Sequence, residues 1–137
     1  MTIDIEKKEI RDINYTPIVQ QTAFWSRVKA HQGLSPKAFD FKIRNRDLYT
    51  NVGGYSYTNA DMLVLQRPLN SEFSMAYVPY GPEIEPSVEN QGDFLENLSE
   101  ILRSYLPTNC IAIRYEELHR YSLRPQLAVA LVRQRQL

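Results

Sequence analysis

The sequence has little of several features that would indicate a function directly. It contains one cysteine, so no disulfide can form within the chain and an oxidising compartment is not implied. Sixteen Lys and Arg balance sixteen Asp and Glu, so the chain lacks the positive charge that drives non-specific binding to nucleic acids or anionic membranes. No stretch approaches the roughly 20 apolar residues that span a bilayer, and Met1 to Arg11 lacks the apolar segment of a signal peptide. We therefore expect a cytoplasmic protein that has no transmembrane segment and binds no DNA.

Sequence motifs for catalysis are also scarce. His31 and His119 have no neighbours at a spacing typical of metal ligands, and no nucleophile elbow, phosphate-binding loop or dinucleotide fingerprint occurs. The only glycine pair, Gly53-Gly54, is not followed by a helix that could face a phosphate. Cys110 starts an apolar run, which favours a buried core residue over a reactive thiol. We predict no metal site, no cofactor and no identifiable catalytic residue.

The distribution of apolar residues predicts an α/β fold with several strands. Phe39 to Arg44 alternates apolar and charged residues, as in a strand with one buried face. Met62 to Gln66 begins with four apolar residues, as in a central strand covered on both faces. Further strands are predicted from Phe73 to Pro79 and from Cys110 to Tyr115. A hairpin-type connection with a tight turn at the glycine pair is expected between the first two.

Two helices are predicted between the strands. Thr22 can serve as the N-cap of a helix that includes Phe24 to Lys29 and ends at Gly33. Ser87 to Leu106 places its apolar residues on one stripe at a period of 3.6, and Pro107 ends it. A long helix between two strands suits a right-handed α/β crossover. Before the first helix, two short extended segments are predicted, from Lys7 to Ile13 and from Pro17 to Gln20.

The C-terminal segment is predicted to be a sheet edge or a tail. A chain of 137 residues with 43% hydrophobic content can bury one core, so we expect one domain over 1–137, with 118–137 its least certain part. Leu127 to Val132 is a run of six apolar residues that could form a last strand. An edge strand invites pairing, and its partner could be a second copy of the chain or a missing second half, or there could be none if this segment is a disordered tail.

Two segments are candidates for binding a ligand. In the first, Tyr77 and Tyr80 flank a proline and precede Gly81, so two phenols are presented by a rigid turn at a strand end. In the second, Trp25 and Lys29 are four residues apart and share a helix face, where a cation beside an indole can hold a phosphate. From the residues alone, aromatic packing and a surface lysine are the commoner explanations.

The order of these segments resembles the N-terminal part of the FemA/FemB family, the aminoacyltransferases that build peptidoglycan cross-bridges. The resemblance covers roughly residues 8 to 117 and is carried by "QTAFWSRVKA", "VLQRPL", "MAYVPYGPEI" and "CIAIRYEE". Its most specific part is Tyr77 to Pro82, which is similar to an aromatic-x-Pro-x-Gly-Pro turn of the family. The chain departs from the family at Tyr80, where a basic residue is more usual, and at Glu116, near which an aspartate is more usual.

The resemblance implies a GNAT-like mixed sheet flanked by helices, here only the first of two such domains. It implies binding of a peptidoglycan precursor, either UDP-MurNAc-pentapeptide or lipid II, with aminoacyl-tRNA as the co-substrate. Lys29, beside Trp25, would then neutralise the diphosphate, and Tyr77 to Gly81 would line the groove for the precursor. Because the second domain and the residues that position the acyl ester are missing from the match, we expect this chain alone to show no aminoacyl transfer.

Three other interpretations remain open at the level of sequence. The chain could be a stand-alone GNAT acyltransferase that uses acetyl-CoA, although the usual glycine-rich phosphate signal is missing. It could be a non-catalytic interaction domain that recruits a partner by strand addition at 127–132. It could also be a truncated remnant without a role of its own.

Overall fold

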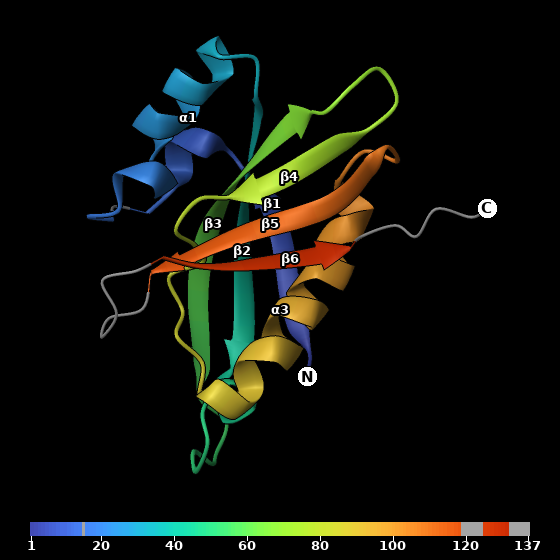
Figure 1. Ribbon diagram of the computed structural model, residues 1–137. Coiled ribbons are helices and arrows are strands. Elements are labelled where there is room, and N and C mark those ends of the chain that lie inside the picture. Colours follow the sequence, from blue (N-terminus) through green and yellow to red (C-terminus); the bar gives the residue numbers. More distant parts are fainter. Residues whose placement is uncertain (15, 119–124, 132–137) are drawn as a thin grey trace, which may run out of the picture.

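The protein is built around one six-stranded mixed sheet (Figure 1). The computed structural model describes residues 1–14, 16–118 and 125–131. The strands are β1 Ile3–Lys8, β2 Ser35–Arg44, β3 Tyr57–Pro68, β4 Ser74–Val78, β5 Cys110–Leu118 and β6 Pro125–Leu131. They lie in the sheet in the order of the sequence, and every neighbouring pair is antiparallel except β4 and β5, which are parallel. The α/β fold expected from the sequence is therefore confirmed.

The helices connect and cover the strands. The longest, α3 Val88–Leu102, joins β4 to β5, as a parallel pair of neighbouring strands requires a long crossover. It runs across one face of the sheet (Figure 1). The other helical segments are α1 Ala23–His31, the single turn α2 Asn45–Leu48, and the short 3-10 turns η1 Ile10–Asp12, η2 Val19–Gln21 and η3 Arg103–Tyr105.

The main hydrophobic core lies between α3 and the sheet. Phe94, Leu98 and Leu102 recur at helical spacing along α3 and are fully buried. Alternate residues of the strands, such as Phe41 of β2 and Ile113 of β5, complete the core. Among the described residues, α1 contributes no side chain to this buried cluster.

The second face of the central strands is also buried. Met62 and Val64 of β3 belong to the core under α3, so Leu63 and Leu65 between them point to the opposite face. All four are at most 1% exposed. Because α1 contacts β2 and β3 without entering the α3 core, the two helices cover opposite faces of the sheet. The prediction of a central strand covered on both faces is confirmed.

Most of the elements predicted from the sequence are present. The segments expected as strands overlap β2, β3, β4, β5 and β6, and β4 is one residue shorter at each end than the predicted Phe73 to Pro79. The glycine pair lies in the connection between the antiparallel strands β2 and β3. Thr22 caps α1 as expected, since its side chain accepts a hydrogen bond from the backbone amide of Trp25. The helix predicted from Ser87 to Leu106 is shorter, because its last turn tightens into η3. Val132 lies outside the described residues, as does His119.

Both predictions for the segments before α1 are confirmed only in part. Lys7 and Lys8 belong to β1 and Glu9 is extended, but η1 interrupts the predicted segment at Ile10–Asp12. In the second segment Ile18 is extended, but η2 begins at Val19. The first strand also begins earlier than predicted, at Ile3. The physical reason is tertiary, because β1 is held by a six-residue register with β2, from Ile3 opposite Ile43 to Lys8 opposite Ala38. Local residue patterns contain no information on such a partner.

No helix among the described residues is both long and apolar enough to cross a bilayer.

Candidate functional site

The side chain of Gln21 joins the segment before α1 to the end of β4. Gln21 is 4% exposed; its Nε2 donates to the carbonyl oxygen of Pro79 at 2.6 Å, and its Oε1 accepts from the amide of Leu63 at 2.8 Å. In the antiparallel register of β3 and β4, Leu65 lies opposite Tyr77. Continued by two residues, this register would place Pro79 opposite Leu63. A proline has no N–H for that ladder. The Gln21 amide therefore replaces a hydrogen-bonded pair that the sheet cannot form.

Gly81 packs directly against this amide. A Cβ at Gly81 would lie 2.7 Å from Nε2 of Gln21 and 2.8 Å from its Cδ, which is closer than non-bonded atoms approach. The amide cannot retreat without loss of its two short hydrogen bonds. Gly81 is buried, and the position requires a glycine because of this close approach and not because of a positive φ.

The backbone of Tyr80 adopts an uncommon conformation. Its φ is 50°, in the left-handed region that bulky residues rarely occupy and that costs roughly 1–2 kcal/mol for a residue with a Cβ. The surrounding turn is held on one side by Gln21 through Pro79. On the other side, Oγ1 of Thr16 donates to Oε1 of Glu83 at 2.6 Å. Backbone strain maintained in this way is typical of ligand-binding positions.

Tyr77 lies beside a cation and a carboxylate from β5. Tyr77 and Arg114 are register partners, and Cζ of Arg114 lies 5.8 Å from the centroid of the Tyr77 ring. Burial, together with a hydrogen bond to Glu116, raises the pKa of Tyr77 well above its ordinary value. Tyr77 therefore stays a neutral phenol at physiological pH. The three side chains share the face opposite α3, because Ile113 and Tyr115 between them on β5 belong to the core.

Trp25 and Lys29 form the pair that their spacing predicts. Nζ of Lys29 lies 4.8 Å from the centroid of the Trp25 ring, within the range of a cation–π interaction. The ammonium also donates to Oε1 of Gln32 at 3.1 Å, in an exposed hydrogen bond. Nε1 of Trp25 is buried and finds no hydrogen-bond acceptor in the part of the chain that the structure describes. The ammonium of Lys29 thus retains N–H groups for an acceptor-rich ligand, whereas Nε1 of Trp25 is not accessible to solvent.

The structure links the turn after β4 to the segment that precedes α1. Tyr77 and Tyr80 lie at the end of β4, and Gly81 meets the side chain of Gln21, four residues before Trp25. Sequence reasoning missed Gln21 and Arg114 as members of this region. A buried glutamine before a helix carries no sequence signal. For Arg114 the sequence offered one signal, because this charged residue stands between the apolar Ile113 and Tyr115, which both belong to the core.

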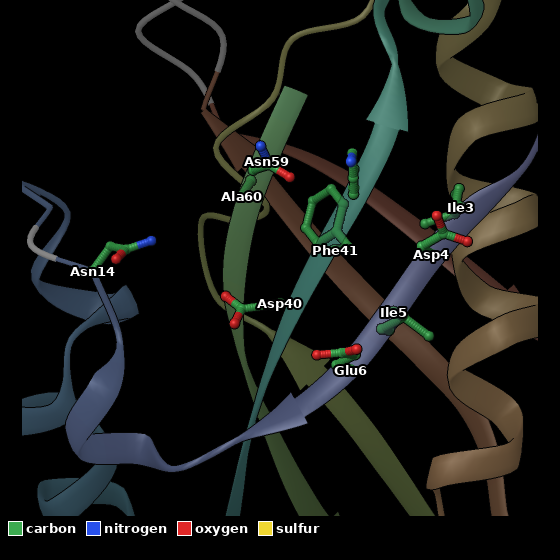
Figure 2. A pocket seen from close by; sticks show the side chains of 10 residues that line it. Ile3, Asp4, Ile5, Glu6, Asn14, Asp40, Phe41, Asn59 and Ala60 are labelled. Carbon is green, nitrogen blue, oxygen red and sulfur yellow. The ribbon is translucent and has the colours of Figure 1, made fainter. Parts of the chain in front are cut away.

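A separate hollow of about 810 Å³ lies over β1, β2 and β3 (Figure 2). Three carboxylates line it, from Asp4 and Glu6 on β1 and from Asp40 on β2. Nζ of Lys8 binds Asp40 at 2.8 Å and Asp61 at 3.0 Å, so part of this negative charge is already neutralised. Within the described ranges, no group of three or more acidic, histidine or cysteine side chains is suited to a metal ion. This hollow lies at the β1 edge of the sheet, among both polar and apolar side chains.

Neither a protein-family model nor a curated protein matches the chain.

Proposed function

We propose that this chain binds a muramyl-peptide precursor of peptidoglycan, as the N-terminal part of a bridge-forming aminoacyltransferase with a GNAT-like fold. One observation carries the proposal: the side chain of Gln21 joins the segment that carries Trp25 and Lys29 to the turn that carries Tyr80 and Gly81. These are the two segments on which the resemblance to the FemA/FemB family depends. Two such segments that belong to one ligand site are expected to be neighbours in space.

The chemistry of the region suits such a ligand. The ammonium of Lys29 is a compact charge that can neutralise a diphosphate, and its present partner, Gln32, is exposed and readily exchanged for a ligand. Tyr77 and Tyr80 offer flat faces and phenolic hydroxyls for a sugar or a peptide. Ligands of α/β sheets bind outside the carboxyl ends of parallel strands, and Tyr77 is the next-to-last residue of β4. Aminoacyl-tRNA would be the co-substrate of the complete reaction.

An acetyl-CoA-dependent acyltransferase is less well supported. That activity needs backbone amides exposed after β4, at the start of α3, to hold a pyrophosphate. The one glycine between the two elements, Gly81, is closed off by the side chain of Gln21. The amide of Ser87, at the start of α3, already donates to the carbonyl oxygen of Leu48.

The proposal is tested by calorimetric titration of the purified chain with UDP-MurNAc-pentapeptide. Lys29→Ala and Tyr77→Ala are each expected to weaken binding at least about tenfold, equivalent to about 1.4 kcal/mol. Arg27→Ala is the matched control, because Arg27 is an exposed cation on the same helix and should leave the affinity unchanged. Absence of binding to a chain that is folded by circular dichroism would refute precursor binding.

The edge of β6 supports a second candidate function, self-association by strand addition. On this edge strand Val129 and Leu131 are 58% and 76% exposed, and as residues two apart they lie on the same face of the strand. A hollow of about 420 Å³ between β6 and α3 lies beside them. Antiparallel pairing of β6 with the same strand of a second copy would extend the sheet through a two-fold axis.

Light scattering after size exclusion tests this second candidate. A dimer that dissociates on Val129→Lys is expected, because a charge placed on an edge strand blocks pairing. The control is Val88→Lys, since Val88 is 85% exposed at the start of α3 and far from the edge in sequence. A wild-type chain that stays monomeric up to high micromolar concentration would exclude self-association.

A further inference from the structure

Arg114 belongs to a row of register partners that crosses β4 and β5, the one parallel pair among the described strands. Its register partner on β4 is Tyr77, whose own partner on β3 is Leu65, and its partner on β6 is Val129. The cation is thus flanked by an aromatic ring on one side and by an exposed apolar side chain on the other. The Arg114 side chain is 42% exposed, so a ligand can reach it.

The guanidinium of Arg114 has unused hydrogen-bond donors. Its Nε is buried and has no acceptor in the part of the chain described by the structure. The nearest carboxylate oxygen, Oε1 of Glu116, lies 3.7 Å from Nη2, which is too long for a hydrogen bond. Glu116 is instead hydrogen-bonded to Tyr77. A buried N–H without an acceptor is costly, and an arginine offers five N–H groups in a planar fork.

We infer that Arg114 is a binding site for an oxyanion, a carboxylate or a phosphate group, beside the carboxyl end of β4 and midway along β5. The Tyr77 ring supports the guanidinium, and Glu116 leaves Nε and the outer N–H groups without hydrogen bonds. A planar oxyanion can accept two parallel hydrogen bonds from such a fork, a geometry that lysine cannot supply. The inference does not rest on the precursor binding proposed above, because none of its observations concerns Trp25, Lys29 or Tyr80.

The test is an NMR titration that follows the Nε–H resonance of Arg114 in the whole chain. Sodium phosphate and sodium acetate are added separately at constant ionic strength, with sodium chloride as the reference salt. We expect a saturable shift of this resonance with one or both oxyanions and none with chloride. A response to phosphate alone identifies a phosphate site, and a response to acetate alone identifies a carboxylate site.

A charge-conserving variant provides the second measurement. Arg114→Lys is expected to weaken oxyanion binding at least about tenfold, because the ammonium keeps the charge and loses the fork. Arg67→Lys is the control, since Arg67 is exposed on β3 and should not alter binding. In the wild-type chain, a visible Nε–H resonance of Arg114 that shifts with neither phosphate nor acetate would by itself overturn the inference. Unchanged oxyanion binding by folded Arg114→Lys would overturn it as well, while binding of UDP-MurNAc-pentapeptide would still support the proposed function.

Discussion

One added methyl group at Gly81 should reveal how strongly the turn after β4 is coupled to the segment before α1. In Gly81→Ala the new Cβ would meet the Gln21 amide at 2.7 Å, so the amide must move. Overpacking of this kind typically costs about 1–3 kcal/mol. Movement also weakens the hydrogen bonds to Leu63 and Pro79, and each buried group left unpaired costs about 1–3 kcal/mol. We expect Gly81→Ala to lower the free energy of unfolding by about 3 kcal/mol.

The same contact predicts that the two residues are not independent. Gln21→Ala alone should cost about 2–4 kcal/mol, because two buried backbone groups lose their partner. In the Gln21→Ala background the methyl group at position 81 has room, so Gly81→Ala should cost almost nothing there. A double-mutant cycle should then give a coupling energy of about 3 kcal/mol, at the upper end of the range for residues in direct contact.

Urea unfolding followed by circular dichroism measures each free energy of the cycle. Gly92→Ala is the matched control, because an added Cβ there meets nothing within 4 Å. Gly92 lies inside α3, where alanine should raise stability by about 1 kcal/mol. Additive effects of Gly81→Ala and Gln21→Ala, or a neutral Gly81→Ala, would refute the contact as the reason for the glycine.

Three further predictions concern α3, the Tyr77 phenol and the start of α1. Leu98→Ala should lower the free energy of unfolding by about 2–5 kcal/mol, whereas exposed Glu96→Ala should change it by less than about 0.5 kcal/mol in the same urea assay. Burial and Glu116 raise the pKa of Tyr77 in the folded chain. Above about pH 10 the unfolded chain releases the phenol proton while the folded chain keeps it. The free energy of unfolding of the wild type should therefore fall above about pH 10, and that of Tyr77→Phe should fall less. Thr22→Ala removes the N-cap of α1 and should cost about 1 kcal/mol in thermal or urea unfolding, and an unchanged stability would argue against the cap.

Elements with a strong internal pattern were predictable because their burial follows the periodicity of the backbone. On β2, Phe39, Phe41 and Ile43 alternate with the more exposed residues Asp40 and Lys42, and all three enter the core from one face of the strand. The apolar run at 62–65 predicted a central strand, and β3 is covered by helices on both faces. The pair of Trp25 and Lys29 follows from helical spacing alone. In each of these cases the sequence pattern spans only a few residues, so it could be recognised without knowledge of any distant groups that it packs against.

The N-terminal segments and the junction of the candidate site could not be predicted in that way. β1 is a strand because β2 stands beside it, some 40 residues later in the sequence. In the sequence Gln21 is an ordinary polar residue. Its role depends on the pairing of β3 with β4, because Pro79 has no N–H and the backbone groups of Leu63 and Pro79 bind the Gln21 amide instead. The importance of Gly81 likewise depends on a side chain 60 positions away.

By itself the sequence determined the α/β class, the two main helices and the side chains that can recognise a ligand, since each of these depends on local propensity and chemical type. The tertiary structure decided which of those side chains meet. It aligned Tyr77 with Arg114 across the parallel strands and joined the start of α1 to the turn after β4 through one glutamine. Contacts between distant residues arise only when the whole sheet forms, because strand order and register depend on all the strands at once.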